Sequence, residues 1–182
     1  MAIFFWFPYI MKGISMSKKP VNTLKPNPNG RTRQGYYNVT NKEKYRGSDV
    51  IIYRSSWEKQ FFKICDMNSK VLEWASEPIK IPYYNPVKKK QGVYIPDVLM
   101  RLQTDKGPVV YLIEIKPTGD LKKPPPVKSH KKASYKTYEK RTRRLMVYAI
   151  NMAKFDAARK FCGKRNWKFL VLTENYFNKM FG

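Results

Sequence analysis

The chain has 182 residues, enough for one domain with a hydrophobic core and too few for two full-sized domains. Hydrophobic residues make up 42% and aromatic residues 15%, which excludes an intrinsically disordered chain. The formal net charge of +24, from 37 Lys and Arg against 13 Asp and Glu, opposes compaction unless a polyanion neutralises it. Nucleic acid is therefore the expected partner, ahead of an anionic membrane surface.

The first fifty residues are predicted to lie outside the main fold. The apolar stretch MAIFFWFPYIM is shorter than the roughly 20 residues of a transmembrane helix and lacks the features of a signal peptide. Because Met16 opens a typical protein start, residues 1–15 are expected to be an upstream extension or a sticky segment docked on a partner. Residues 17–50 are polar, basic and rich in proline and glycine, which predicts an arm lying along phosphates, with a solvated tail as the alternative.

The folded domain is predicted over residues 50–182, after an extension and basic arm over 1–49. A helix begins near Ser55, because Trp57, Phe61, Ile64 and Cys65 share one stripe at helical spacing. The remaining predicted elements are strands at 71–74, 78–83, 94–103, 109–116 and 167–173, helices at about 131–161 and 174–181, a basic loop at 84–92 and a stiff proline-rich connector at 117–129. A turn at 105–107 makes strands 94–103 and 109–116 a hairpin. This order predicts an α/β fold, a mixed sheet with helices packed on it.

The two cysteines and the histidine do not indicate a zinc site or a disulfide-rich scaffold. Cys65 and Cys162 lie in apolar helical patterns and are predicted to be buried free thiols, with a single disulfide as the alternative. His130 lies in a lysine run without Cys or His at ligand spacing, which argues against zinc and favours a solvated residue.

Residues 111–119, YLIEIKPTG, place an acid and a base at the end of an apolar strand. Positions i and i+2 of a strand share a face, so Glu114 and Lys116 should project together. If strands 94–103 and 109–116 are neighbours, their register brings Asp97 beside Glu114. Two close carboxylates repel unless a cation lies between them, and Mg²⁺ prefers such oxygen ligands. The alternative for both acids is that they are solvent-facing strand residues.

An Asp followed by Glu-x-Lys on the next strand resembles the PD-(D/E)xK nuclease superfamily. The fuller string is more specific: Tyr53–Glu58, Trp74, Glu77, Ile81–Tyr83, Tyr94–Asp97 and Leu112–Pro117. It is similar to the head completion nucleases of contractile-tailed phages (myoviruses) and, more distantly, to the TnsA-type endonuclease subunit of transposons. The resemblance covers about residues 45–177.

The resemblance implies a restriction-endonuclease-like fold and a metal-dependent DNA endonuclease that processes or guards the packaged DNA end before tail attachment. Asp97, Glu114 and Glu58 would hold Mg²⁺, with Mn²⁺ as the alternative ion, and Lys116 would assist the nucleophile. The expected partners are double-stranded DNA and phage head or portal-neck proteins, with no membrane and no small-molecule substrate. The expected location is the host cytoplasm during assembly, or the virion head.

Glu58 has a second interpretation that needs no catalytic role. Ser55-x-x-Glu58 is a capping box, in which Glu58 bonds back to the helix N-terminus. The two interpretations stay open at the level of sequence. Glu77 is the substitute candidate for the third carboxylate.

A basic segment follows the predicted catalytic strand and is expected to bind DNA. Its cations, with Glu139 as the only acid among them, are Lys122, Lys123, Lys128, Lys131, Lys132, Lys136, Lys140, Arg141, Arg143 and Arg144. It could track a phosphate backbone past the metal, with weak sequence specificity. The alternative function is a non-catalytic DNA-binding head or neck structural protein with a nuclease-like fold, and a basic RNA binder is a third option.

Overall fold

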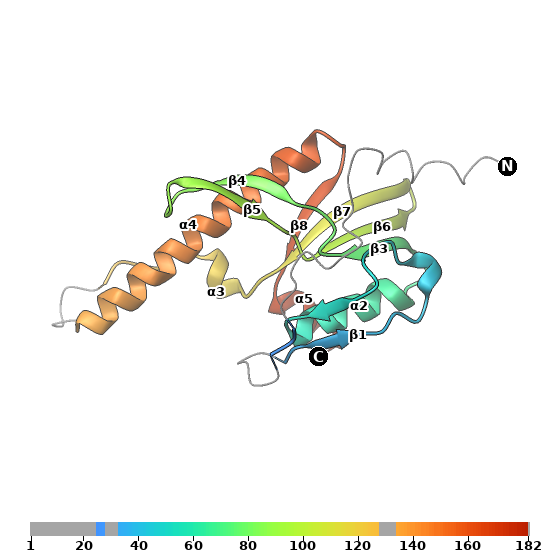
Figure 1. Ribbon diagram of the computed structural model, residues 1–182, viewed down its shortest axis with the longest axis horizontal. Coiled ribbons are helices and arrows are strands. Elements are labelled where there is room, and N and C mark those ends of the chain that lie inside the picture. Colours follow the sequence, from blue (N-terminus) through green and yellow to red (C-terminus); the bar gives the residue numbers. More distant parts are fainter. Residues whose placement is uncertain (1–24, 28–32, 128–133, 182) are drawn as a thin grey trace. The chain divides into compact units, whose positions relative to one another are not determined.

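The computed structural model describes residues 25–27, 33–127 and 134–181 (Figure 1). In chain order its elements are β1 (Gly35–Tyr37), η1 (Lys42–Lys44), β2 (Ile51–Tyr53), α2 (Ser56–Met67), β3 (Val71–Ser76), β4 (Ile81–Asn85), β5 (Lys90–Tyr94), β6 (Val98–Thr104), β7 (Gly107–Ile115), α3 (Thr118–Leu121), α4 (Tyr135–Gly163), β8 (Lys168–Leu172) and α5 (Glu174–Phe181). The expectations for residues 1–15, for His130 and for Lys128, Lys131 and Lys132 lie outside the described residues.

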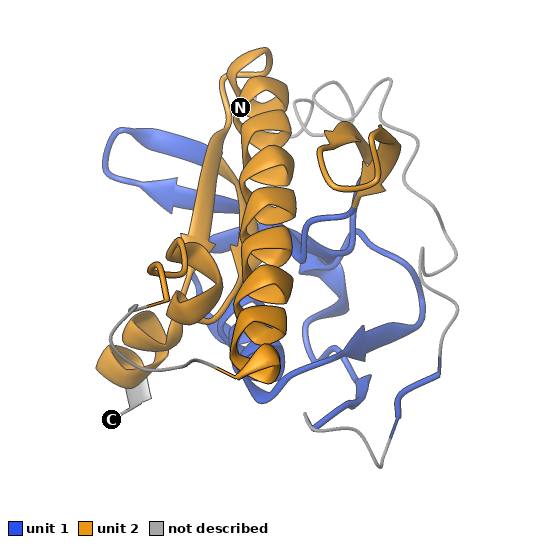
Figure 2. Cartoon of the chain, turned by 90° about the vertical axis from the view of Figure 1, so that its left-hand side faces the viewer, with its two compact units in different colours: residues 1–80, 95–109 blue, residues 81–94, 110–182 orange. Residues whose placement is uncertain are grey.

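The main sheet is mixed, as the sequence predicts, with strand order β3-β6-β7-β8. β3 pairs with β6 in antiparallel register, and β7 pairs with β8 in parallel register. The chain forms two compact units, residues 1–80 with 95–109 and residues 81–94 with 110–182 (Figure 2). It changes unit before and after the β4–β5 hairpin and again within β7.

The first unit is organised around Trp74 on β3, which is 1% exposed. Phe62 of α2 lies with its ring centroid 5.5 Å from that of Trp74, and Tyr45 approaches edge-on at 4.7 Å. Tyr37 of β1 also packs edge-on against Trp74, at 6.1 Å. The part of the predicted arm from residue 33 onward thus carries β1 and η1 and packs on α2 and β3, because its tyrosines supply the apolar surface that the rest of the arm lacks.

The second unit combines the β4–β5 hairpin, the strand pair β7–β8 and the long helix α4. The hairpin runs beside α4, with its turn toward the N-terminal half of the helix (Figure 1). Phe155 of α4 packs against Phe169 of β8, with ring centroids 5.6 Å apart. Gly92 is required opposite Tyr83, since a Cβ at residue 92 would lie 2.9 Å from the Tyr83 ring.

The predicted basic loop at 84–92 is wrong in its second half. Residues 90–94 form β5, whose partners run from Ile81↔Tyr94 to Asn85↔Lys90. Tyr94 therefore ends β5 and does not begin β6, which starts at Val98. The long helix begins at Tyr135 and continues to Gly163, and a short helix, α3, interrupts the predicted connector. The closing helix matches its predicted range.

Candidate active site at the end of β7

Glu114 lies near the end of β7 and is only 3% exposed. Its Oε1 is 3.0 Å from the Lys116 ammonium, so the acid and the base meet as the two-residue period predicts. Ile113 and Ile115, which alternate with them, are buried as expected. The ammonium belongs to a side chain that is 30% exposed, so the pair connects a buried carboxylate to the surface.

Tyr94 is the site residue to which the sequence analysis gives no role. Its hydroxyl donates a 2.7 Å hydrogen bond to Oε2 of Glu114, and its side chain is 2% exposed. Lys154 of α4 places its ammonium 5.6 Å from the Tyr94 ring centroid and 5.8 Å from that of Tyr83. Both distances are within cation–π range. The one signal in the sequence is a tyrosine three residues before Asp97, which the sequence pattern assigns to the start of a strand and the structure to the end of β5.

Backbone and side-chain bonds fix the chain beyond β7. The Lys116 amide donates to the Leu172 carbonyl at 2.9 Å, which extends the pairing with β8. The Thr118 amide donates to Oε2 of Glu174 at 2.8 Å. This bond holds the pKa of the Glu174 carboxyl below its ordinary value, because it favours the charged form. The backbone is therefore anchored at Lys116 itself and again two residues later at Thr118.

Asp97 belongs to the first unit and directly precedes β6. Its carbonyl accepts a 2.9 Å hydrogen bond from the amide of Glu77, which follows β3. Glu77 has a left-handed backbone, φ 44°, and its Oε1 is 3.5 Å from Nε of Arg54. Burial raises the pKa of Glu77, and Arg54 opposes that shift. The predicted substitute acid thus shares the end of the β3–β6 pair with Asp97.

Glu58 forms a variant of the capping box, in which the Arg54 amide takes the place of the Ser55 amide. Its backbone amide donates to Oγ of Ser55 at 3.1 Å, and its Oε2 accepts from the Arg54 amide at 2.7 Å. The Ser55 hydroxyl also donates to Oε1 of Glu58 at 3.0 Å. These contacts are those of the capping alternative, and metal ligation by Glu58 stays a prediction.

The meeting of Asp97 and Glu114 also stays a prediction, because the two acids belong to different units. The donor chemistry suits Mg²⁺: both are carboxylates, and the lone pairs of Glu114 are not exhausted by Tyr94 and Lys116. No group of three or more His, Cys, Asp or Glu side chains that could hold a metal ion occurs within residues 25–27, 33–127 and 134–181. Mg²⁺ commonly binds through one or two carboxylates together with water and substrate phosphates.

The described part of the predicted DNA-binding segment lies on both sides of the proline run. Lys122 and Lys123 follow α3 and are exposed. On the N-terminal half of α4 the basic side chains are Lys136, Lys140, Arg141, Arg143 and Arg144. Nε of Arg141 donates to the Pro125 carbonyl at 2.7 Å, and Arg143 pairs with Glu139 at 2.9 Å. The other cations leave a basic face on the N-terminal half of α4.

A family model described as TnsA-like endonuclease N terminal matches residues 68–174. The chain belongs to this family. The matched segment of the TnsA-like domain contains Glu77, Asp97, Glu114 and Lys116 and leaves Glu58 outside. A curated relative, the head completion nuclease of Enterobacteria phage T4, is 36% identical over 137 residues, which cover 74% of this chain and 87% of the T4 protein.

These comparisons confirm the resemblance to which the sequence motifs point, and the mixed sheet flanked by helices is consistent with a restriction-endonuclease-like fold. Within the described residues, no helix combines the length and apolar character needed to cross a membrane.

Proposed function

We propose that the chain is a Mg²⁺-dependent DNA endonuclease that acts in phage head completion, where it processes or guards the packaged DNA end before tail attachment. The observation that carries the proposal is the buried Glu114 carboxylate, engaged by Tyr94 and Lys116 within the segment that matches the endonuclease family. The name of the T4 relative supports the biological setting. On this view the chain works with head or portal-neck proteins in the host cytoplasm or the virion head.

The arrangement around Glu114 is costly if its role is only structural. A buried charge costs several kcal/mol unless it is well paired, and apolar residues of similar size often stabilise a fold as well or better. Glu114 is nevertheless buried at a strand end, beside a lysine that reaches the surface. Such a placement suits a carboxylate that must keep one orientation while it binds a cation.

Each residue has a distinct role in the proposed reaction. Asp97 and Glu114 would hold the ion through their carboxylates, and Tyr94 fixes the rotation of the Glu114 carboxylate. A divalent ion held there would supply Lewis-acid chemistry, by lowering the pKa of a coordinated water and by stabilising charge on the scissile phosphate. Lys116 keeps a positive charge beside Glu114, where it can orient the water and neutralise charge that develops on the phosphate. Glu77 is the candidate for a third carboxylate, since it lies beside Asp97.

A plasmid-nicking assay tests the proposal. Wild-type protein should cut with Mg²⁺ or Mn²⁺ and lose activity with EDTA. Asp97→Asn and Glu114→Gln should each reduce the rate by at least about 100-fold while DNA binding persists, because electrostatic groups at a reacting centre typically supply such factors. Asp105→Asn, an exposed carboxylate on the β6–β7 turn, is the matched control and should cut normally.

Two results would contradict the enzyme. Equal cutting by wild type and both acid variants would point to a contaminating nuclease. Normal DNA binding with no cutting in any protein, under either metal, would favour the non-catalytic DNA-binding head or neck protein instead.

A further inference from the structure

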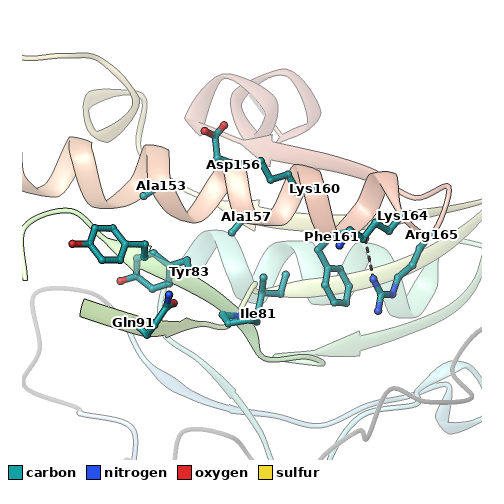
Figure 3. A pocket seen from close by; sticks show the side chains of 12 residues that line it. Ile81, Tyr83, Gln91, Ala153, Asp156, Ala157, Lys160, Phe161, Lys164 and Arg165 are labelled. Atoms are coloured by element: carbon teal, nitrogen blue, oxygen red, sulfur yellow. Dashed lines mark hydrogen bonds between the residues drawn. The ribbon is translucent and has the colours of Figure 1, made fainter. Parts of the chain in front are cut away.

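A groove in the second unit has no role in the site at Glu114. It lies between the base of the β4–β5 hairpin and the C-terminal half of α4, with a volume of about 880 Å³ (Figure 3). The hairpin lines it with Tyr83 and Tyr84, and the C-terminal half of α4 and the residues directly after it line it with Ala153, Ala157, Lys160 and Lys164. The volume lies within the range of ligand-binding clefts, about 300–1,000 Å³.

The sequence of α4 explains why the space is open. Ala153 and Ala157 are four residues apart, so they lie on the same side of the helix, and Figure 3 shows both directed toward the hairpin. Their small side chains leave room that larger residues would fill. Phe161 and Arg165 close the far end, where the guanidinium carbon lies 3.6 Å from the ring centroid. Arg165 also donates a 3.1 Å hydrogen bond to the Phe161 carbonyl, so this end is held in place.

The lining joins aromatic faces to positive charge. Tyr84 is 54% exposed, and Lys160 and Lys164 are exposed at the helix edge. Asp156 is the only acid in the lining, and its Oδ1 is already paired with Arg159 at 3.0 Å. Exposed rings that stack on bases, with cations that meet phosphates, are the features by which proteins bind single-stranded nucleic acid.

We propose that this groove binds a single strand of DNA, which makes it a second DNA-contacting surface of the protein. The inference rests on the proposed nuclease function, because that function makes DNA the substrate. An unpaired strand fits better than a duplex: bases are free to lie against Tyr84 and the apolar floor, whereas a duplex offers mainly phosphates to a basic surface.

The hairpin connects the groove to the candidate active site. Ile81, in the groove lining, pairs directly with Tyr94, whose hydroxyl holds Glu114. At its other end, the hairpin turn presents three exposed lysines, 88–90. The turn is fixed by the Asn85 side chain, which accepts hydrogen bonds from the amides of Val87 and Lys88 at 3.0 and 2.9 Å. The same hairpin thus lines the groove, supplies the tyrosine that holds Glu114 and presents the three lysines.

The test measures binding of the full chain to a fluorescent oligothymidylate and to a duplex of equal length, by anisotropy in EDTA. Tyr84→Ala should weaken single-strand binding roughly five- to hundredfold, the range for loss of one stacked base. Lys160→Ala with Lys164→Ala should lower the log–log salt slope for the single strand by about 1.4, at about 0.7 per phosphate contact. Ala157→Leu, which fills the groove and leaves every charge in place, should also weaken single-strand binding. Duplex affinity should stay near that of the wild type.

Matched controls come from the first unit. Tyr36 is 56% exposed, so Tyr36→Ala removes an equally exposed ring, and Lys63→Ala with Lys70→Ala removes two exposed lysines. Neither control should change single-strand binding beyond the common effect of net charge. Thermal melting shows that each variant is folded, and the lysine pair, at exposed positions, keeps the test decisive if one groove variant does not fold.

Three outcomes would overturn the inference. Wild-type oligothymidylate binding by all groove variants would leave the groove to another occupant, such as a peptide of a head protein. Equal losses for single strand and duplex would reduce it to a general phosphate surface. An equal loss of single-strand affinity in the Tyr36→Ala control would show that bases do not stack specifically on Tyr84. Because binding is measured without metal, a protein that binds the single strand but never cuts DNA would fail as the proposed nuclease and still support the groove.

Discussion

The two oxygens of Glu114 are engaged from different directions, and this pair of contacts is the most informative feature at the scale of single residues. Lys116 directly follows the same strand, two residues away, while Tyr94 comes from the β4–β5 hairpin. A hydrogen bond to a charged group contributes about 1.5–3 kcal/mol, so Tyr94 should restrict the rotation of the carboxylate as well as stabilise the fold.

Tyr94→Phe tests this positioning role. The ring volume is kept, but one bond to a buried charge is lost, so the free energy of unfolding should fall by about 1–3 kcal/mol. The cleavage rate should fall, and the Mg²⁺ concentration needed for half-maximal rate should rise, because the carboxylate is less well oriented. Urea unfolding and metal titrations of the cleavage rate measure the two effects. Tyr83→Phe is the matched control, as its hydroxyl only accepts a bond from Asn85 in the same hairpin. An unchanged metal requirement in Tyr94→Phe would reduce its role to packing.

Glu58→Gln separates the capping role from metal ligation. A glutamine also serves in a capping box, so the variant should keep its stability. If Glu58 acts only as a cap, as its contacts indicate, the cleavage rate should stay close to that of the wild type. Ser55→Ala should cost about 1 kcal/mol of stability through loss of the cap. A large loss of metal-dependent cleavage in Glu58→Gln, with normal stability, would restore the ligand interpretation.

Of the two contacts of Glu114, the one with Lys116 is predictable from the sequence and the one with Tyr94 is not. The Glu114–Lys116 pair follows from the two-residue period of a strand, which is a local rule. The bond from Tyr94 joins residues 20 apart in sequence and depends on β5 being a strand. The three lysines at 88–90 lead to the prediction of a loop in place of β5, since a run of lysines is typical of a solvated loop.

At the scale of elements, the β4–β5 hairpin depends on contacts with the rest of its unit, above all with α4. Along β4, buried and exposed residues alternate, from buried Ile81 through exposed Pro82 and Tyr84 to buried Asn85, whereas β5 is mostly exposed. β5 is therefore held by its pairing with β4 and by packing of the hairpin on α4, neither of which is visible in its own sequence. Strongly periodic or apolar segments, such as β7 and α5, are predicted close to their observed bounds.

The N-terminal segment is also held by contacts with another element, and Asp66 supplies them. Asp66 is fully buried at the end of α2, and it accepts hydrogen bonds from the Tyr37 hydroxyl and from the amides of Thr40 and Asn41, at 3.1, 2.8 and 2.9 Å. Burial and the negative charge of Asp66 raise the pKa of Tyr37, which keeps its hydroxyl a donor. The Asp66 carboxylate thus holds the N-terminal segment, at Tyr37, Thr40 and Asn41, against the end of α2.

Asp66→Ala should release this docking. Three donors lose a charged acceptor, and a hydrogen bond to a charged group contributes about 1.5–3 kcal/mol. Thr40 is exposed and Tyr37 and Asn41 are half-buried, so water can replace part of what is lost, and the free energy of unfolding should fall by at least about 1.5 kcal/mol. Amide hydrogen exchange should also accelerate at Thr40 and Asn41 more than in β7. Chemical denaturation and exchange mass spectrometry measure these changes. Asp105→Ala, at an exposed turn, should leave both unchanged. Uniform acceleration across the chain would show general destabilisation instead of local undocking.

At the scale of the whole molecule, buried acids make the surface more basic than the composition suggests. Asp66, Glu73 and Glu114 are all buried, and Glu73 is occupied by Arg46 and Arg101 at 2.9 and 2.8 Å. Glu73 pairs with Arg46 and Arg101, and Glu114 pairs with Lys116, so these two carboxylates do not neutralise the exposed lysines of α4. The excess positive charge therefore remains on the surface, where it can bind a polyanion. This use explains why the chain carries a charge that opposes folding through self-repulsion.

The salt dependence of duplex binding tests where that charge is used. Lys136 and Lys140 are exposed and four residues apart on α4, so they lie on one face of the helix. Replacing both by alanine should lower the log–log salt slope of duplex affinity by about 1.8, at about 0.9 per phosphate contact. Lys63→Ala with Lys70→Ala changes the net charge equally and should leave the slope almost unchanged, because these lysines would make no direct phosphate contact. Anisotropy titrations over a series of salt concentrations give both slopes. Equal reductions in the two variants would mean that duplex DNA responds to total charge and not to the basic face of α4.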